Sequence, residues 1–121
     1  MAERRMFAKS VITSDKFMGM PLSSQALYIH LNMNADDDGF VGNPKMIVRM
    51  TGASEDDFKL LIFKKFVIPF KSEIIAITHW KTNNFIRKDR YKETVYISEK
   101  RQLEQLMLNS DNLLPIKDKS L

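Results

Sequence analysis

The chain has 121 residues, of which 44% are hydrophobic and 28% are charged, with 19 Lys and Arg against 15 Asp and Glu. This length and composition predict a single folded domain and argue against a disordered chain. The absence of cysteine excludes disulfides, thiolate metal sites and cysteine nucleophiles. No apolar stretch has the length of a membrane-spanning helix or of a signal peptide. We therefore expect a cytoplasmic protein that does not contact membranes.

Capping residues predict two helices in the first third of the chain. Ser14 is placed to cap a short helical turn over residues 15–18. Ser23 or Ser24 is then expected to cap a longer helix that runs to about Asn34, because apolar residues recur there at helical spacing. These two elements form the start of a mainly helical domain.

An aspartate run follows the longer helix. Asp36-Asp37-Asp38-Gly39 predicts a turn with solvated side chains, and residues 39–41 predict a very short strand. The run lacks the spaced ligands and the terminal glutamate of a calcium-binding loop. We therefore expect neither a metal nor a cofactor here.

A short helix is predicted after this strand. Asparagine caps helices, and proline at the first helical position loses no backbone hydrogen bond, so Asn43-Pro44 predicts a helix start. The helix is expected to cover about residues 44–50 and to bury Met46, Ile47 and Met50.

The most specific local pattern is the turn that joins this helix to the next one. In Thr51-Gly52-Ala53, Gly52 suits the left-handed conformation that ends many helices. Ser54 then caps the second helix, and Asp57 stands where the acidic residue of a capping box is found. Two short helices joined by such a turn are typical of a helix-turn-helix.

A β-hairpin is predicted after the second helix of the pair. Residues 66–70 and 74–80 are rich in β-forming side chains, and residues 71–73 form the turn between them. Pro69 suits an edge strand, because it cannot donate a hydrogen bond. The element order predicts a winged helix-turn-helix, a mainly α fold with a small β-hairpin wing, in which Lys71 lies at the tip of the wing.

The outward face of the helix over residues 54–66 is poorly suited to phosphate, because it is acidic at its start and apolar in its middle. Lys59 and Lys64 flank this face and are candidate DNA contacts. Leu60 and Phe63 are predicted to point outward, which favours a protein interface or a dimer contact. The alternative is that a flanking segment of the chain covers them.

A basic segment after the hairpin gives the stronger indication of a polyanionic partner. Residues 84–92 interleave cations with aromatic side chains, which pack against sugar or base. The cations expected to contact phosphate are Arg87, Lys88, Arg90 and Lys92. The alternative is a solvated loop with three apolar side chains in the core, Phe85, Ile86 and Tyr91.

The remaining charged and polar residues predict no catalytic site. Two interpretations are open for Arg4, Arg5 and Lys9: a basic arm that adds to the nucleic-acid contact, or a flexible N-terminal arm, which we favour. Neither His30 nor His79 has a nearby Ser/Asp arrangement in the sequence, and there is no glycine-rich phosphate loop. We therefore expect a binding protein and not an enzyme.

The C-terminal part is predicted to end the domain. Residues 93–108 are interpreted as an amphipathic strand-to-helix stretch, and apolar residues at its end are spaced for a helix. The domain is thus expected to cover residues 1–108, with a flexible tail or the start of a linker over residues 109–121.

Several segments together resemble phage replication initiation proteins of Gram-positive hosts, often called replisome organizers, whose N-terminal domains are similar to DnaD-like winged helices. The resemblance covers roughly residues 5–100, and its first segment is Met20-Pro21-Leu22-Ser23-Ser24-Gln25-Ala26-Leu27-Tyr28-Ile29-His30-Leu31. The other segments that carry it are Ala35–Val41, Asn43-Pro44-Lys45, His79-Trp80, Asn83-Asn84, Ile86–Arg90 and Thr94-Val95-Tyr96.

This resemblance implies a domain that binds phage origin DNA, or self-associates on it, and helps to load the host helicase machinery. The expected partners are double-stranded DNA and further copies of the chain in a homo-oligomer. In the family, helicase loading involves a second, C-terminal domain, so we expect that role to need a region outside this chain. Two alternatives share the winged-helix fold: a protein-interaction module and a small transcriptional regulator.

Overall fold

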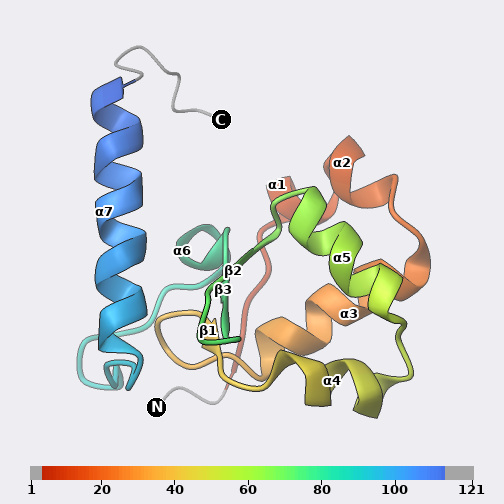
Figure 1. Ribbon diagram of the computed structural model, residues 1–121, viewed down its shortest axis with the longest axis horizontal. Helices are drawn as coiled ribbons and strands as arrows, with labels where there is room; N and C mark the ends of the chain where they lie inside the picture. Colours follow the sequence, from red (N-terminus) through yellow and green to blue (C-terminus); the bar gives the residue numbers. More distant parts are fainter. Residues whose placement is uncertain (1–3, 114–121) are drawn as a thin grey trace.

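The computed structural model describes residues 4–113 (Figure 1). Helices make up most of the regular structure, and a small antiparallel sheet lies among them. The elements in chain order are α1 (Lys9–Ile12), α2 (Asp15–Met18), α3 (Leu22–Met33), β1 (Phe40–Val41), α4 (Pro44–Thr51), α5 (Glu55–Phe63), β2 (Val67–Pro69), β3 (Ile75–Ile77), α6 (Trp80–Asn83) and α7 (Ile97–Leu113). No helix within residues 4–113 combines the length and the apolar character that crossing a bilayer requires.

The first helix starts follow the predictions in part. Ser14 caps α2 as predicted, because its hydroxyl accepts the Phe17 N–H at 3.2 Å. The predicted caps of α3 are wrong. Pro21 occupies the N-cap position of α3, and the hydroxyls of Ser23 and Ser24 instead donate to the Asp57 carboxylate at 2.8 and 2.7 Å. A carboxylate that is distant in sequence therefore binds both hydroxyls.

Helix α4 begins at the predicted proline but buries a different face. The Asn43 side chain makes no capping hydrogen bond, so that prediction is wrong. Met46 and Met50 are exposed, contrary to expectation. The buried face consists of Pro44, Ile47 and Val48. The helix packs against α3, which selects this face over the one that carries the two methionines.

The turn and the capping box between α4 and α5 are confirmed. Gly52 has φ of +78°, the left-handed conformation predicted for the end of α4. The Ser54 hydroxyl accepts the Asp57 N–H at 3.1 Å, and the Asp57 carboxylate accepts the Ser54 N–H at 3.0 Å. With Ser23 and Ser24 also bound, the Asp57 carboxylate joins the first turns of α3 and α5.

These hydrogen bonds make stability depend on the ionisation of Asp57. The Ser54 backbone N–H, with smaller contributions from the serine hydroxyls, lowers the pKa of Asp57 from 3.8 to about 2 despite its burial. Since the folded-state pKa is depressed, the stabilisation is complete above pH 4 and is lost as the pH falls toward 2. One pKa unit corresponds to about 1.4 kcal/mol, so we expect a loss on the order of 2 kcal/mol.

Urea denaturation between pH 5 and pH 2 measures this contribution. We expect Asp57→Asn to be less stable than the wild type at pH 5, and the difference to shrink as the pH falls. Asp56→Asn removes an exposed carboxylate from the same helical turn and serves as the control. Parallel pH profiles for the wild type and Asp57→Asn would contradict the prediction.

The predicted hairpin forms, and it joins a three-stranded sheet in the order β1-β3-β2. Ala76 in the central strand faces Phe40 on one side and Ile68 on the other. Pro69 lies in an edge strand, as predicted. Successive side chains of a strand point to opposite faces. The core between the sheet and the helices includes Val41, Val67, Ile75 and Ile77, and the smaller core on the other face includes Phe40, Ile68, Ile74 and Ala76.

The second strand of the hairpin ends earlier than predicted. Strand β3 stops at Ile77, and Trp80 begins helix α6, so the expectation that His79 and Trp80 continue the strand is wrong. The Trp80 indole N–H donates to the Asp37 carbonyl at 3.0 Å, and the side chain is buried. This contact turns the chain away from the sheet after β3.

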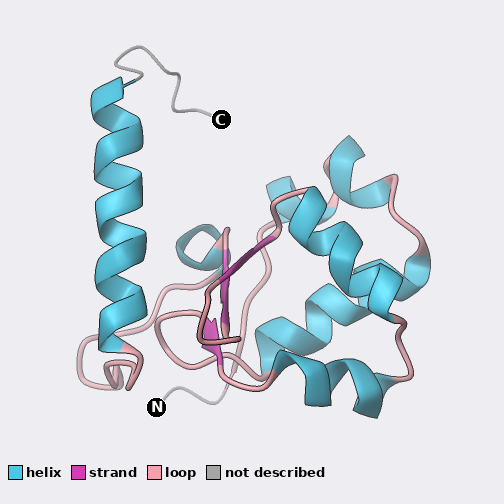
Figure 2. Cartoon of the chain, viewed as in Figure 1, coloured by secondary structure: helices cyan, strands magenta, loops and turns pink. Residues whose placement is uncertain are grey.

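Helix α7 lies to one side of the sheet, and the N-terminal half of the helix contacts the second face (Figure 2). Tyr96, just before the helix, and Leu103 within it pack against the smaller core. Residues 93–96 form no strand, contrary to the expected strand-to-helix stretch. The helix continues to Leu113, so the predicted domain boundary after residue 108 falls inside it. The remainder of the predicted tail, residues 114–121, lies outside the described residues.

Candidate nucleic-acid interface

The basic segment forms an irregular loop between α6 and α7, residues 84–96, which we call the basic loop. The side chains of Arg87, Lys88, Arg90 and Lys92 are exposed on it. Arg87 forms an exposed ion pair with Asp89 at 3.0 Å. The other three cations form no side-chain hydrogen bond or ion pair with any of residues 4–113. The basic loop therefore presents positive charge that the described protein does not neutralise.

The aspartate run holds the basic loop in place. In residues 36–39, which we call the acidic turn, Asp37 accepts the Lys92 N–H at 3.0 Å and Asp38 accepts the Thr94 N–H at 2.9 Å. Asp36 accepts the Thr94 hydroxyl. Asp37 is buried, so the expected solvated turn is wrong. The carboxylates are directed inward because they supply acceptors to a loop that has no strand partner.

A hydrogen-bonded group around Asp38 fixes the middle of the basic loop. The Tyr91 hydroxyl donates to the Asp38 carboxylate at 2.6 Å, and the Lys100 ammonium donates to the Tyr91 oxygen at 3.0 Å. Lys100 also lies 3.4 Å from Asp38 and 3.3 Å from Glu93. Tyr91 thus does not pack in the core, and its hydroxyl has fixed hydrogen-bond partners at the surface.

The protonation states of this group match the hydrogen bonds. Burial raises the pKa of Tyr91, and its hydrogen bond to Asp38 raises it further. Burial alone would lower the pKa of Lys100, but the hydrogen bonds to Tyr91 and Glu93 and the charge of Asp38 outweigh burial and raise it. At neutral pH Tyr91 therefore keeps its proton and Lys100 its positive charge.

Arg5 is a buried structural residue, contrary to the expectation that it lies in a flexible arm. Its side chain is 3% exposed and lies 3.6 Å from the Asp37 carboxylate. The guanidinium also donates to the Ala35 carbonyl at 2.5 Å and lies over the Trp80 ring at 5.1 Å from the centroid. The N-terminal segment therefore packs against both the acidic turn and α6.

Two neighbouring asparagines tie the start of the basic loop to the same segment. The side-chain oxygens of Asn83 and Asn84 accept the backbone N–H groups of Ala8 and Met6, each at 2.8 Å. The Asn83 amide also donates to the Tyr28 hydroxyl at 2.9 Å in the core. These roles escaped sequence reasoning. The only feature of the local sequence that could have indicated these roles is the pair of adjacent asparagines directly before an apolar residue.

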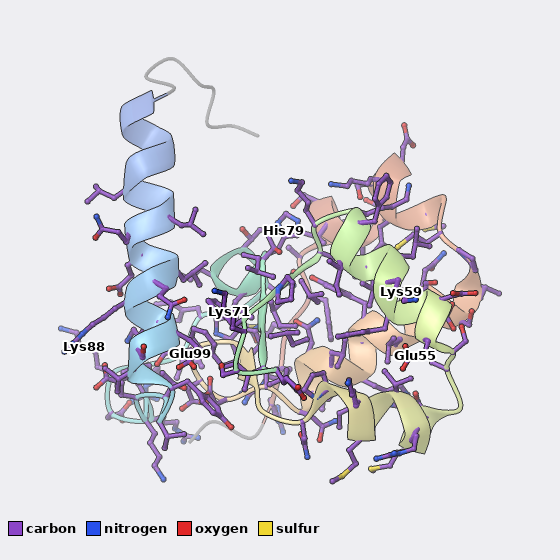
Figure 3. The ribbon with its side chains drawn as sticks, in the orientation of Figure 1. Glu55, Lys59, Lys71, His79, Lys88 and Glu99 are labelled. Carbon is purple, nitrogen blue, oxygen red and sulfur yellow. The ribbon has the colours of Figure 1, made fainter. Side chains whose placement is uncertain are left out.

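The seven cations expected to contact DNA do not form one surface. Figure 3 shows Lys88 at one end of the molecule, Lys59 on α5 toward the other, and Lys71 between them. Lys64 follows α5 and is half-buried. Lys71 is exposed in the hairpin turn, where the neighbouring Ser72 hydroxyl donates to Glu99 of α7 at 2.7 Å. The structure thus brings together only the four cations of the basic loop.

The two apolar residues predicted on the outward face of α5 have different surroundings. Phe63 is 79% exposed, as predicted. Leu60 is half-buried against the main core, which also contains Val11 and Phe17 from the N-terminal helices. The expectation that Leu60 points outward is therefore wrong. Self-association through Phe63 stays a prediction.

No protein-family model, curated protein or solved structure matches this chain. Among the residues that the structure describes, no three His, Cys, Asp or Glu side chains are grouped so that they could hold a metal ion. In the acidic turn, the carboxylates of Asp37 and Asp38 accept hydrogen bonds from backbone N–H groups of the basic loop. The basic loop is the feature with the clearest binding chemistry.

Proposed function

We propose that this chain is a winged-helix domain that binds DNA through the basic loop. The order α3, β1, α4, α5, β2, β3 supports the winged-helix assignment, with β2 and β3 as the wing. The pairing of β1 with β3 supports it as well, because β1, which lies between α3 and α4 in the chain, adds a third strand to the hairpin of the wing. In this assignment α5 is the second helix of the helix-turn-helix, which usually enters the major groove.

The observation that carries the proposal is the set of three unpaired, exposed cations within five residues of an anchored loop, namely Lys88, Arg90 and Lys92. Contacts at both ends hold the backbone, so little conformational entropy is lost when phosphate binds. By contrast, α5 begins with exposed Glu55 and Asp56, which repel phosphate. The proposed DNA contact is therefore the basic loop and not the start of α5.

The resemblance to replisome organizers supports a role in phage DNA replication. In this proposal the domain is a non-enzymatic binding protein that acts at the phage origin in the cytoplasm of the bacterial host and works as a homo-oligomer.

Charge reversal in the basic loop tests the proposal. The variant Lys88→Glu/Arg90→Glu/Lys92→Glu is expected to weaken DNA binding by roughly a hundredfold or more at low salt, because each cation that neutralises a phosphate releases counterions. The log–log dependence of affinity on salt is also expected to become shallower by about 0.9 for each lost contact on duplex DNA. Fluorescence anisotropy with labelled origin DNA measures both quantities.

A matched control applies the same charge change to the helical part. Lys45, Arg49 and Lys59 are exposed on α4 and α5, and their replacement by Glu should leave most of the affinity intact. Equal losses in the two triple variants would indicate a general effect of net charge and would overturn the assignment of the basic loop. Absence of wild-type binding at low salt would overturn the function itself.

A further inference from the structure

Phe85 stands out in the basic loop because the residues on either side of it are anchored while its own ring is 78% exposed. The Asn84 side chain is buried and bonded to the Met6 N–H, and Ile86 packs against the main core. Asn84 has extended backbone angles, φ −126° and ψ 141°, and in an extended chain successive side chains point to opposite sides. The ring is therefore held outward by the packing of its neighbours.

The other aromatic residues of the basic loop have structural partners. Tyr91 is bonded to Asp38 and Lys100, and the Tyr96 ring packs beside Phe40 at 6.3 Å between centroids. Phe85 forms no ring contact with any aromatic or cationic side chain of residues 4–113. Phe85 is thus the aromatic side chain of the basic loop whose ring has no such partner, and exposed cations follow it in the chain.

We propose that the basic loop binds single-stranded nucleic acid, with an unpaired base stacked on Phe85 and the neighbouring phosphates bound by the loop cations. This inference rests on the proposed function and specifies its ligand. In a duplex the base faces are covered by adjacent base pairs, so an exposed ring has no base face to contact. A single strand offers both a charged backbone and accessible base faces, which matches an aromatic ring beside cations.

The surface of α5 favours the same ligand. Duplex readers of this fold place α5 in the major groove, but here Glu55 and Asp56 occupy its first turn. Phosphates of both strands line that groove, so these carboxylates oppose entry of α5. The basic loop lies at the other end of the molecule from Lys59 and can bind a single strand without α5 (Figure 3).

Anisotropy titrations with oligodeoxythymidine, oligouridine and a duplex of equal length test the inference. The wild type is expected to bind a single strand more tightly than the duplex. Phe85→Ala is expected to weaken single-strand binding by roughly tenfold, since each base that stacks on an aromatic ring contributes a factor of that order, and to leave duplex binding unchanged. Oligodeoxyuridine has the same base as oligouridine, so a difference in affinity between these two oligonucleotides identifies the preferred sugar.

Two further variants separate stacking from general surface effects. Leu22→Ala removes an equally exposed apolar side chain from α3 and should leave single-strand affinity unchanged. Phe85→Trp keeps a stacking surface and should retain binding, and its exposed indole should be quenched when oligonucleotide is added. Trp80, the only native tryptophan, is buried and contributes a constant background.

The outcomes distinguish this inference from the proposed function. If the duplex binds as tightly as the single strands and Phe85→Ala changes neither, single-strand recognition is overturned while DNA binding by the loop stands. If Leu22→Ala weakens binding and Phe85→Ala does not, the affinity does not come from stacking on the basic loop and the inference is again overturned. If no nucleic acid binds at low salt, the proposed function fails with it.

Discussion

Replacing Arg5 by methionine is expected to lower the free energy of unfolding by about 3 to 5 kcal/mol, the usual cost of leaving a buried charge without its partner. The Arg5 and Asp37 side chains are both almost completely buried, and the guanidinium also contacts Ala35 and Trp80. Methionine retains much of the volume but neither the charge nor the hydrogen bonds. Urea denaturation at neutral pH measures the loss.

Two comparisons decide whether the loss comes from the ion pair. Arg4→Met removes an exposed arginine next to Arg5 and should change stability by less than about 0.5 kcal/mol. Adding Asp37→Asn to Arg5→Met removes the unpaired charge and should recover part of the stability. If the double variant is less stable than Arg5→Met by the full cost of Asp37→Asn alone, the two residues are not coupled and the interpretation is wrong.

Replacing Gly39 by alanine is expected to cost about 3 kcal/mol, because two independent problems coincide at this position. Its φ of +85° is unfavourable for any residue with a Cβ, which costs roughly 1 to 2 kcal/mol. A Cβ would also lie 2.6 Å from Cγ of Trp80, so the indole or the acidic turn must move. Thermal or urea denaturation measures the combined effect.

Gly52 provides a matched control within the same fold. Its φ is +78°, but no atom would lie within 4 Å of an added Cβ. Gly52→Ala should therefore show only the backbone cost, about 1 kcal/mol. Equal losses at Gly39 and Gly52 would show that the close approach to Trp80 has no energetic consequence.

Several local signals in the sequence predicted local structure correctly. The Ser14 cap, the left-handed Gly52 and the Ser54–Asp57 capping box each depend on residues within four positions of one another. The hairpin likewise follows from a short turn between two β-rich runs. In these cases the physical cause lies inside the window that sequence reasoning examines.

Several of the failed predictions involve partners that are distant in sequence. Ser24 bonds to a carboxylate 33 residues away, and Trp80 bonds to a carbonyl 43 residues away. The aspartates of residues 36–38 resemble a solvated turn until their partners across more than 50 residues are known. A serine or an aspartate has the same local signature whether it binds water or a distant buried group, so sequence alone could not separate these cases.

The candidate site was predictable in composition but not in internal organisation. Alternating cations and aromatic residues predicted the basic loop. The same pattern could not show that Tyr91 is bonded to the acidic turn while Phe85 is displayed, because both are aromatic residues among cations. The distinction depends on Asp38 and on the core contact of Ile86.

The connection between the basic loop and α7 has a mechanical consequence. Lys100, one turn into the helix, is bonded to Tyr91 of the loop, and Glu99 is bonded to Ser72 of the hairpin. A helix of this kind is stiff along its axis. A rotation or a pull applied to α7 would therefore act on the loop and on the hairpin together, through these two hydrogen bonds.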